Sequence, residues 1–233
     1  MAQKVIRFLL LGVVALALCI AIASFTKIHN FFGINRAETQ EKVVALSYDD
    51  GPTPPYTNQL IALLDRYQIQ ATFFTIGKNI EQHPDLVKLA IAKGEELGNH
   101  SYSHKDMLFK SKDYLLSELE KTDALLRQLG VTQTINFRPP WGRRLLMLPY
   151  LVAKLHKQLI MWDIDSEDYR KDLTAEAIAD RVIEQARPGA IIVMHDGGGD
   201  RSRTVVATEL IIKTLTAQGY KFKTVSQLLT FDR

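Results

Sequence analysis

Two histidines and a pair of aspartates have the types and the spacing of a catalytic metal site. His100 and His104 lie four residues apart, and Asp49 and Asp50 are neighbours in the sequence. Two imidazoles and one carboxylate leave coordination positions open for water and substrate, as catalytic metal centres require. The second carboxylate remains free to move protons. This combination is typical of a metal-dependent hydrolase.

The metal ligands that we predict are Asp50, His100 and His104. An i, i+4 spacing brings two side chains onto one face of a helical turn. The Gly-Pro turn after Asp50 lets the backbone bend so that both aspartates reach one pocket. Either feature alone is more often ordinary surface, and their combination favours a site. Zinc is the default ion, although these ligand types also accept cobalt, nickel, manganese or iron.

Two further residues fit roles beside such a metal. Arg138 precedes two prolines that make its loop rigid, and its guanidinium is a natural counter-charge for a carboxylate. His195 ends a fully apolar run. It can act as a general acid if a carboxylate keeps it charged, and we expect Asp165 to do so. The alternatives are an incidental surface arginine and a structural histidine bonded to backbone.

Short runs of β-forming residues alternate with longer helical stretches after residue 42. The predicted strands are Val43–Tyr48, Ala71–Ile76, Glu95–Asn99, Thr134–Arg138, Leu159–Ile164, Ala190–Met194 and Lys221–Val225. The predicted helices are Tyr56–Tyr67, Pro84–Lys93, Asp113–Leu129, Leu148–His156, Thr174–Ala186 and Thr204–Gln218. Seven strands alternating with helices predict an α/β fold with a parallel sheet, most simply closed into a (β/α)7 barrel.

The polar clusters all fall at one end of these predicted strands. Each lies at or just past the C-terminal end of a different strand, the residues being Asp49, His100, Arg138, Asp165 and His195. In a β/α barrel those strand ends form the active-site face. We therefore expect the five clusters to meet in one pocket.

The start of the chain has the composition of a membrane segment. Residues 8–25 contain no charged side chain, which is close to the roughly 18–20 apolar residues that cross a bilayer. We expect residues 1–26 to be an uncleaved transmembrane anchor, or a signal segment if the alanines before Ser24 mark a cleavage site. Residues 27–41 are then a linker and residues 42–233 an extracytoplasmic catalytic domain, secreted if the segment is cleaved.

The amino-acid composition argues against a disulfide-stabilised domain and against a nucleic-acid-binding protein. The only cysteine, Cys19, lies in the apolar segment, so the exported part has no disulfide. The net charge of +3 is spread thinly, and no basic stripe suggests nucleic-acid binding. No protein partner is evident, and a chain of this size suits one catalytic domain.

The site residues, in their order along the chain, resemble the five motifs of the polysaccharide deacetylases of carbohydrate esterase family 4, the NodB-homology domain. The counterparts are Tyr48-Asp49-Asp50-Gly51, His100-Ser101-x-x-His104, Arg138-Pro139-Pro140-Trp141, Asp165-x-x-Asp168-Tyr169 and Val193-x-His195. Each motif alone is weak, and five in order over residues 42–230 are specific. The resemblance implies a distorted β/α barrel.

The resemblance also implies roles for individual residues. Asp49 would be the catalytic base, adjusted by Arg138, and His195 the acid, adjusted by Asp165. The backbone N–H of Trp141 would help to bind the oxyanion.

Three substrate-binding positions depart from the usual motifs. Trp141 stands where Tyr is usual, Tyr169 where Trp is usual, and Val193 where Leu is usual. These changes put the fit of the substrate in doubt and leave the reacting groups complete.

The substrate implied is an N-acetylated glycan, with peptidoglycan N-acetylglucosamine first. Chitin oligomers, an envelope glycolipid, or a non-catalytic envelope glycan-binding role are the alternatives.

Overall fold

A fully buried strand, β1 (Val43–Asp49), lies at the centre of the sheet. We describe it from a computed structural model that defines residues 31–232. β1 consists of apolar residues with Ser47, Tyr48 and Asp49 at its C-terminal end, and such a run is typical of a parallel strand covered on both faces. The strand therefore begins in the apolar core and places Asp49 at the C-terminal edge of the sheet.

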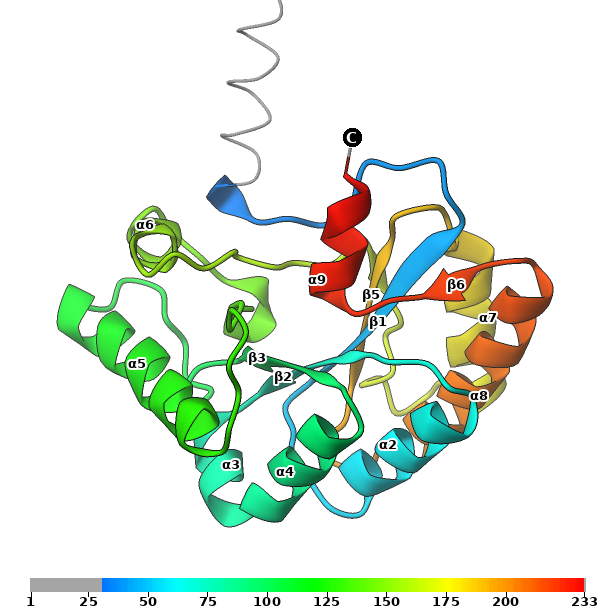
Figure 1. Cartoon of the computed structure of the whole chain (residues 1–233), viewed down its shortest axis with the longest axis horizontal. Coiled ribbons are helices and arrows are strands. Elements are labelled where there is room, and N and C mark those ends of the chain that lie inside the picture. The colour runs from blue at the N-terminus through cyan, green and yellow to red at the C-terminus, as the bar shows by residue number, and fades with distance from the viewer. Residues whose placement is uncertain (1–30, 233) are drawn as a thin grey trace, which may run out of the picture.

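The other strands extend the sheet on both sides of β1. They are β2 (Thr72–Thr75), β3 (Glu96–Asn99), β4 (Ile164–Asp165), β5 (Ile191–His195) and β6 (Lys221–Phe222). Their order is β3-β2-β1-β5-β4, with β6 paired to the start of β1 (Figure 1). Every pair is parallel, so the C-terminal ends of the strands collect on one side of the domain.

Two of the seven predicted strands consist largely of isolated bridges. Within residues 31–232 the segment predicted at 134–138 pairs only through Phe137, which bridges to Asn99 and to Leu159. The two prolines that follow Arg138 offer no N–H, so this strand cannot continue. The α/β fold with a parallel sheet is confirmed, while the sheet closes irregularly rather than as seven regular strands.

The segment predicted as a strand over 159–164 changes partner halfway. The amide of Met161 donates to the carbonyl of Ile34, whereas the amide of Asp163 donates to the carbonyl of Ile191. Only Ile164 and Asp165 then form a regular pair with β5. This change of partner is a tertiary feature that local sequence pattern does not encode.

The predicted helices are present with ends shifted by a few residues, as is usual. They are α2 (Tyr56–Arg66), α4 (Pro84–Ala92), α5 (Lys112–Gln128), α6 (Met147–Lys154), α7 (Ala175–Gln185) and α8 (Ser202–Ala217). Two short helices were not predicted, α3 (Gly77–Gln82) and α9 (Val225–Leu228). α9 begins at a capping box in which Thr224 and Gln227 exchange hydrogen bonds, so the predicted strand ends early.

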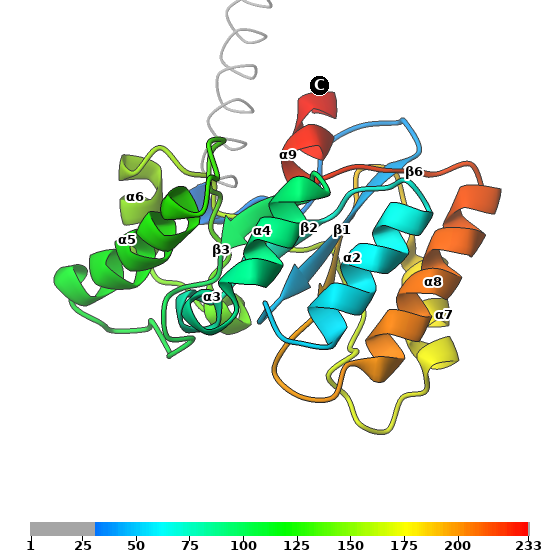
Figure 2. The same cartoon turned by 60° about the horizontal axis from the view of Figure 1, so that its bottom comes forward.

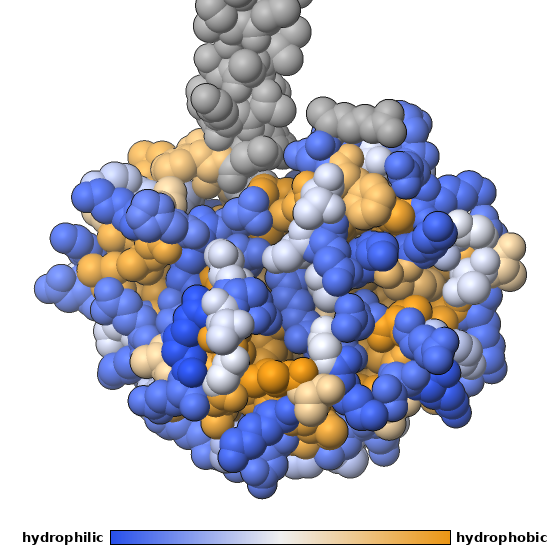
Figure 3. Space-filling model, in the orientation of Figure 1, coloured by the Kyte–Doolittle hydropathy of each residue, from blue (hydrophilic) through white to orange (hydrophobic). Residues whose placement is uncertain are grey.

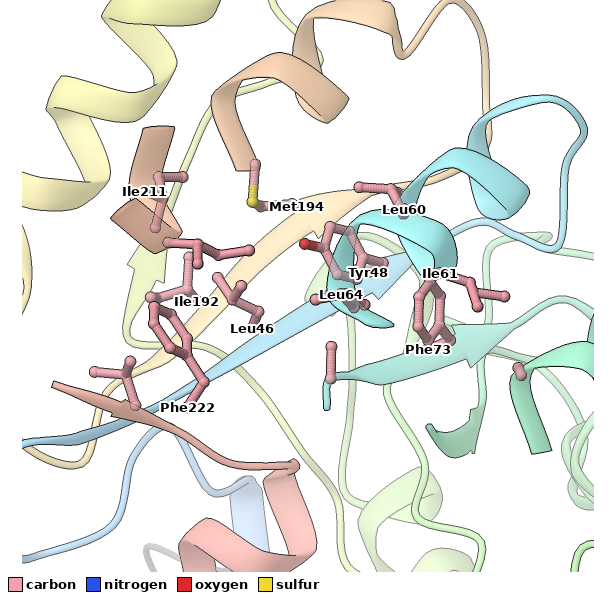
Figure 4. Packing of buried hydrophobic residues seen from close by; sticks show 14 of the residues in the cluster. Leu46, Tyr48, Leu60, Ile61, Leu64, Phe73, Ile192, Met194, Ile211 and Phe222 are labelled. Atoms are coloured by element: carbon pink, nitrogen blue, oxygen red, sulfur yellow. The ribbon is translucent and has the colours of Figure 1, made fainter. Parts of the chain in front are cut away.

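The main apolar core lies between the sheet and the layer formed by α2, α7 and α8 (Figures 2 and 4). Leu46 and Tyr48 of β1 and Ile192 of β5 face Leu60 and Ile211 of the helices, and none of these five side chains is exposed. Each fully buried side chain of this size stabilises the fold by about 1.5–3 kcal/mol. The core therefore holds β1 and β5 rigidly against each other.

The N-terminal membrane segment expected at residues 1–26 lies outside the described residues. Within residues 31–232 no helix is long and apolar enough to span a bilayer. Part of the expected linker belongs to the fold, because Ile34 bridges to Ile160 and Arg36 to Ala190. Ala37 is buried as well. The domain thus begins several residues before residue 42.

Candidate active site

A cavity of about 500 Å³ opens at the C-terminal ends of the strands. That volume lies within the range usual for small-molecule sites. The lining residues come from all five predicted motifs, from the segment before β4 and from the loop after β5: Asp49, Asp50, His104, Trp141, Trp162, Asp165, Tyr169, Val193, His195 and Arg201. The polar clusters therefore meet in one pocket.

Three side chains form a group that fits a divalent cation. The ligand atoms of Asp50, His100 and His104 all lie within 4.8 Å of one another. Asp50 Oδ1 is 3.1 Å from His104 Nε2 and 3.6 Å from His100 Nε2. Among residues 31–232, no residue donates a hydrogen bond to this buried oxygen. A buried carboxylate oxygen facing two imidazole nitrogens is the donor set that transition-metal dications prefer.

The tautomer of His100 also suits a ligand. Its Nδ1 lies 2.7 Å from the carbonyl oxygen of Arg138, so Nδ1 carries the proton and donates it there. Nε2 then keeps its lone pair and points toward Asp50. Burial lowers the pKa of His100, which favours the neutral, ligating form. Burial would raise the pKa of Asp50, but the neighbouring histidines outweigh it and keep that carboxyl ionised.

The backbone of these loops is held in a sparsely populated conformation. Asp50, Ser101, His104 and Trp141 have φ values of 77°, 67°, 51° and 53°. Non-glycine residues with positive φ carry strain, which persists where surrounding contacts impose it. Asn79 supplies one such contact, because its side-chain amide donates to the Asp50 carbonyl at 2.8 Å. These four are half of the eight non-glycine residues with positive φ in the described part of the chain, so strained backbone is a feature of the site.

Asp49 is bound by a fully buried arginine. Arg138 Nη1 donates to Asp49 Oδ1 at 2.7 Å, and the same nitrogen donates to Ser47 Oγ at 2.9 Å. The guanidinium also lies 4.1 Å above the ring of Phe74. One oxygen of Asp49 is therefore held by Arg138, while Oδ2 lies 3.9 Å from His100 Nε2 at the metal group. Arg138 stands behind Asp49 and does not line the cavity.

His195 faces Asp49 across the β1–β5 pair, because the two residues are partners in the parallel register. Its Nδ1 lies 2.7 Å from Asp168 Oδ1, and its backbone amide donates to Asp168 Oδ2 at 2.9 Å. Burial would lower the pKa of His195, but the bond and charge of Asp168, then Asp49 and Asp50, raise it to about 9. The imidazole is therefore charged at neutral pH.

The prediction that Asp165 keeps His195 charged is corrected by this geometry. Asp165 lines the cavity, but its Oδ1 accepts the amide of Glu167 at 2.9 Å and the carboxylate makes no hydrogen bond to His195. Asp168 instead bonds His195 and accepts the hydroxyl of Thr204 at 2.8 Å. The two acids stand three residues apart, and the sequence offered no means to decide which of them bonds His195.

Aromatic side chains form two walls of the cavity. Trp141 is 55% exposed and its ring lies 4.6 Å from that of His104. Tyr169 is 50% exposed and meets His195 edge-on at 5.8 Å. Val193 is buried at the base of the pocket beside them. Exposed aromatic faces beside charged groups suit a ligand with both apolar and polar surfaces.

The loop after β5 contains two residues that the sequence analysis did not single out. Arg201 is buried, and it donates through Nε to the Gly197 carbonyl at 2.6 Å. Its charge also helps to lower the pKa of Asp168, after the contributions of His195 and Thr204. Asp196 is buried and accepts the Thr57 hydroxyl at 2.6 Å. Both residues lie close to the His195 motif in the sequence, and that was the one feature that could have indicated their place at the site.

Three consecutive glycines, residues 197–199, follow the His195 motif. At Gly197 a Cβ would come within 2.1 Å of the Asp50 carbonyl oxygen. The backbone of this residue therefore packs directly against the metal group. Glycine is needed here for close approach rather than for flexibility.

Comparison with known proteins agrees with the motifs. The family model described as polysaccharide deacetylase matches residues 36–159. A peptidoglycan-N-acetylglucosamine deacetylase of Bacillus cereus is 36% identical over 82% of this chain and 90% of its own length. The peptidoglycan-N-acetylmuramic acid deacetylase PdaC of Bacillus subtilis is 34% identical over 86% of this chain and 42% of its own length.

Solved structures give the same result. The Bc1960 peptidoglycan N-acetylglucosamine deacetylase superimposes with a TM-score of 0.84 at 27% identity, covering 90% of this chain and 99% of that chain. BA3943, described as a CE4 family pseudoenzyme from Bacillus anthracis, superimposes with a TM-score of 0.79 at 28% identity. It covers 86% of this chain and 70% of its own.

Proposed function

Because this chain belongs to the polysaccharide deacetylase family, we propose that it removes N-acetyl groups from peptidoglycan, first from N-acetylglucosamine, and releases acetate. One observation carries the proposal. A base candidate (Asp49), a metal-ligand group and a charged acid candidate (His195) border a single cavity. The names and the similarity of the relatives support peptidoglycan as the substrate.

Asp50, His100 and His104 would hold the divalent cation, for which zinc is our first choice. When bound, such a cation polarises the acetyl carbonyl and lowers the pKa of water toward about 7. Asp49 would accept the proton of the attacking water, because Arg138 binds its Oδ1 and leaves Oδ2 toward the metal group. The new C–O bond forms as this proton leaves.

His195 would complete the reaction. Its imidazolium would donate a proton to the amine nitrogen as the C–N bond breaks, which yields acetate and a free amino sugar. The bond from Asp168 orients the ring so that Nε2 faces the cavity. The backbone N–H of Trp141 would bind the oxyanion, with Tyr169 and Val193 shaping the space for the sugar and the acetyl methyl.

We further propose that the domain works outside the cytoplasm on a single-pass anchor. The uncharged run of residues 8–25 supports this, since its length suits a bilayer span. Peptidoglycan is accessible from that side. Cleavage of the segment would instead release a secreted enzyme.

The direct test is acetate release by residues 31–233, which retain the bridging residues Ile34 and Arg36. We expect release from peptidoglycan and N-acetylglucosamine oligomers with added zinc or cobalt. Chelation with EDTA should abolish it, and the added metal should restore it. Substrates with acetyl groups only on N-acetylmuramic acid would show which of the two peptidoglycan sugars the enzyme deacetylates. Metal binding without acetate from any glycan would contradict the proposal and would point to the non-catalytic glycan-binding alternative.

The pH dependence tests the assignment of the acid. Activity that needs protonated His195 should persist above pH 7 and fall as the pH passes about 9. Asp168→Asn removes the main contribution that raises this pKa, so the alkaline fall should move to lower pH by about 1–3 units. Asp165→Asn is the matched control, because Asp165 makes no hydrogen bond to His195, and it should move the limb less. The reverse order of shifts would refute the role of Asp168.

A further inference from the structure

The outward side of α6 and the loop before it are apolar. Leu145, Leu146, Met147 and Tyr150 are 44%, 69%, 45% and 45% exposed, and Phe32 nearby is 38% exposed. We call these five residues the α6 face. In Figure 3 apolar surface lies over this part of the domain, beside the start of the described chain. Contiguous exposed apolar surface usually marks an interaction site.

The fold does not need these side chains for its own core. Leu148, Leu151 and Val152 on the other side of α6 are already buried against α5 and neighbouring segments. A helix on a water-exposed surface normally has a polar outer face. α6 therefore presents apolar groups in both directions, and the outer set has no covering element among residues 31–232.

The segment that carries the α6 face is basic, although two of its cations already have partners, Arg143 in Asp106 and Lys157 in Asp123. Residues 143–157 contain Arg143, Arg144, Lys154 and Lys157 and no acidic residue. Lys154 lies 5.3 Å from the ring of Tyr150, so a cation and an aromatic ring share one edge of the face. An apolar helical face bordered by cations and aromatic rings is the pattern of segments that lie on anionic membranes.

The position of the α6 face in the chain favours a bilayer as its partner. Arg144 donates to the carbonyl of Phe32, which ties the loop before α6 to the second described residue. The uncharged run of residues 8–25 ends six residues before Phe31. Six residues span at most about 20 Å. If that run enters a bilayer, the α6 face is held within reach of its surface.

We propose that the α6 face contacts the surface of a bilayer that contains anionic lipids. Leu146, Met147 and Tyr150 enter the boundary between headgroups and acyl chains, while Lys154 meets lipid phosphates. This contact goes beyond the proposed deacetylation and sets the orientation of the domain. Trp141, on the pocket wall, precedes Leu145 by four residues, so the contact also determines how far the pocket lies from the membrane.

A fluorescent probe on the full-length chain tests the contact. Leu146→Cys in a Cys19→Ser background is labelled with an environment-sensitive fluorophore and reconstituted into phosphatidylcholine vesicles with phosphatidylglycerol. Val206→Cys on α8 is the matched control, because Val206 is 49% exposed and lies outside the α6 face. We expect a shift of emission to shorter wavelength, and quenching by nitroxide-labelled lipid, at position 146 only. Tyr150→Cys should repeat the result of Leu146→Cys.

Several outcomes would overturn the proposal. One is water-like emission at positions 146 and 150 while flotation shows the chain bound to vesicles, and another is a chain that does not float with them. A shift that needs no lipid and grows with protein concentration would assign the α6 face to a second copy of the chain. Acetate release from soluble oligomers is measured separately, so failure of this contact and failure of the deacetylase proposal are distinguishable.

Discussion

Asp49→Asn should lower acetate release at least a hundredfold, by about 10²–10⁴-fold, while leaving the metal in place. The asparagine amide oxygen can still accept the hydrogen bond from Arg138, which now goes to Asp49 Oδ1 at 2.7 Å. The variant therefore keeps the shape and packing of the site but cannot take a proton from water. Loss of a positioned base costs about 10²–10⁴-fold in rate. We expect kcat to fall by that factor with little change in bound metal, measured by acetate release and by elemental analysis.

The neighbouring residue supplies the control. Asp50→Asn makes the same chemical change one position later, at the carboxylate that the two histidines face. That variant should lose bound metal and turnover together, and excess metal should restore part of its activity. Added metal should not restore the Asp49 variant. If Asp49→Asn kept more than a tenth of its activity, Asp49 would not be the base and another group would have to take the proton.

The meeting of the site residues could be predicted from the sequence because parallel strands align their ends. Asp49 and His195 each end an apolar run, and the register of β1 with β5 makes them direct partners. The prediction needed only strand positions and the rule that the C-terminal ends of parallel strands lie together. The same rule predicted that Arg138 and Asp165 lie at the active-site face, although it could not predict their contacts.

What the sequence could not supply was the direction of individual side chains in loops. Asp165 and Asp168 belong to one motif, and the backbone path between them decides which carboxylate bonds His195. That path includes Glu167 with a φ of 54°, a conformation that residue type does not announce. The close packing of Gly197 against the Asp50 carbonyl could not be predicted either, because it is a contact between loops that are far apart in the chain.

The irregular closure of the sheet has a related cause. Phe137 bridges to residues on two other segments, and the segment after it changes partner between Met161 and Asp163. Local pattern gave both segments the character of strands, and that character is retained in their burial. Hydrogen-bond partners come from tertiary structure, so β propensity alone could not distinguish a strand from a series of bridges.

Arg138→Met should lower the free energy of unfolding by about 3–5 kcal/mol, the usual cost of breaking a buried ion pair. Arg138 has no exposed surface, and its loss leaves Asp49 buried without its counter-charge. The carboxylate of Asp49 also loses the hydrogen bond that fixes its orientation, so kcat should fall as well. Denaturant unfolding and kcat measured on the same preparation would report both effects.

Two comparisons separate this account from a simple loss of packing. Arg143→Met breaks an ion pair with Asp106 in which both side chains are exposed, at 55% and 40%. It should change stability little, because exposed pairs contribute little. Combining Arg138→Met with Asp49→Asn should recover part of the lost stability, since the second change removes the unpaired charge. If the double variant were as unstable as the sum of both single variants, Arg138 would stabilise the fold mainly through its contact with Phe74 and the hydrogen bond from its Nη2 to the Met161 carbonyl at 3.0 Å. Its role at Asp49 would then be secondary.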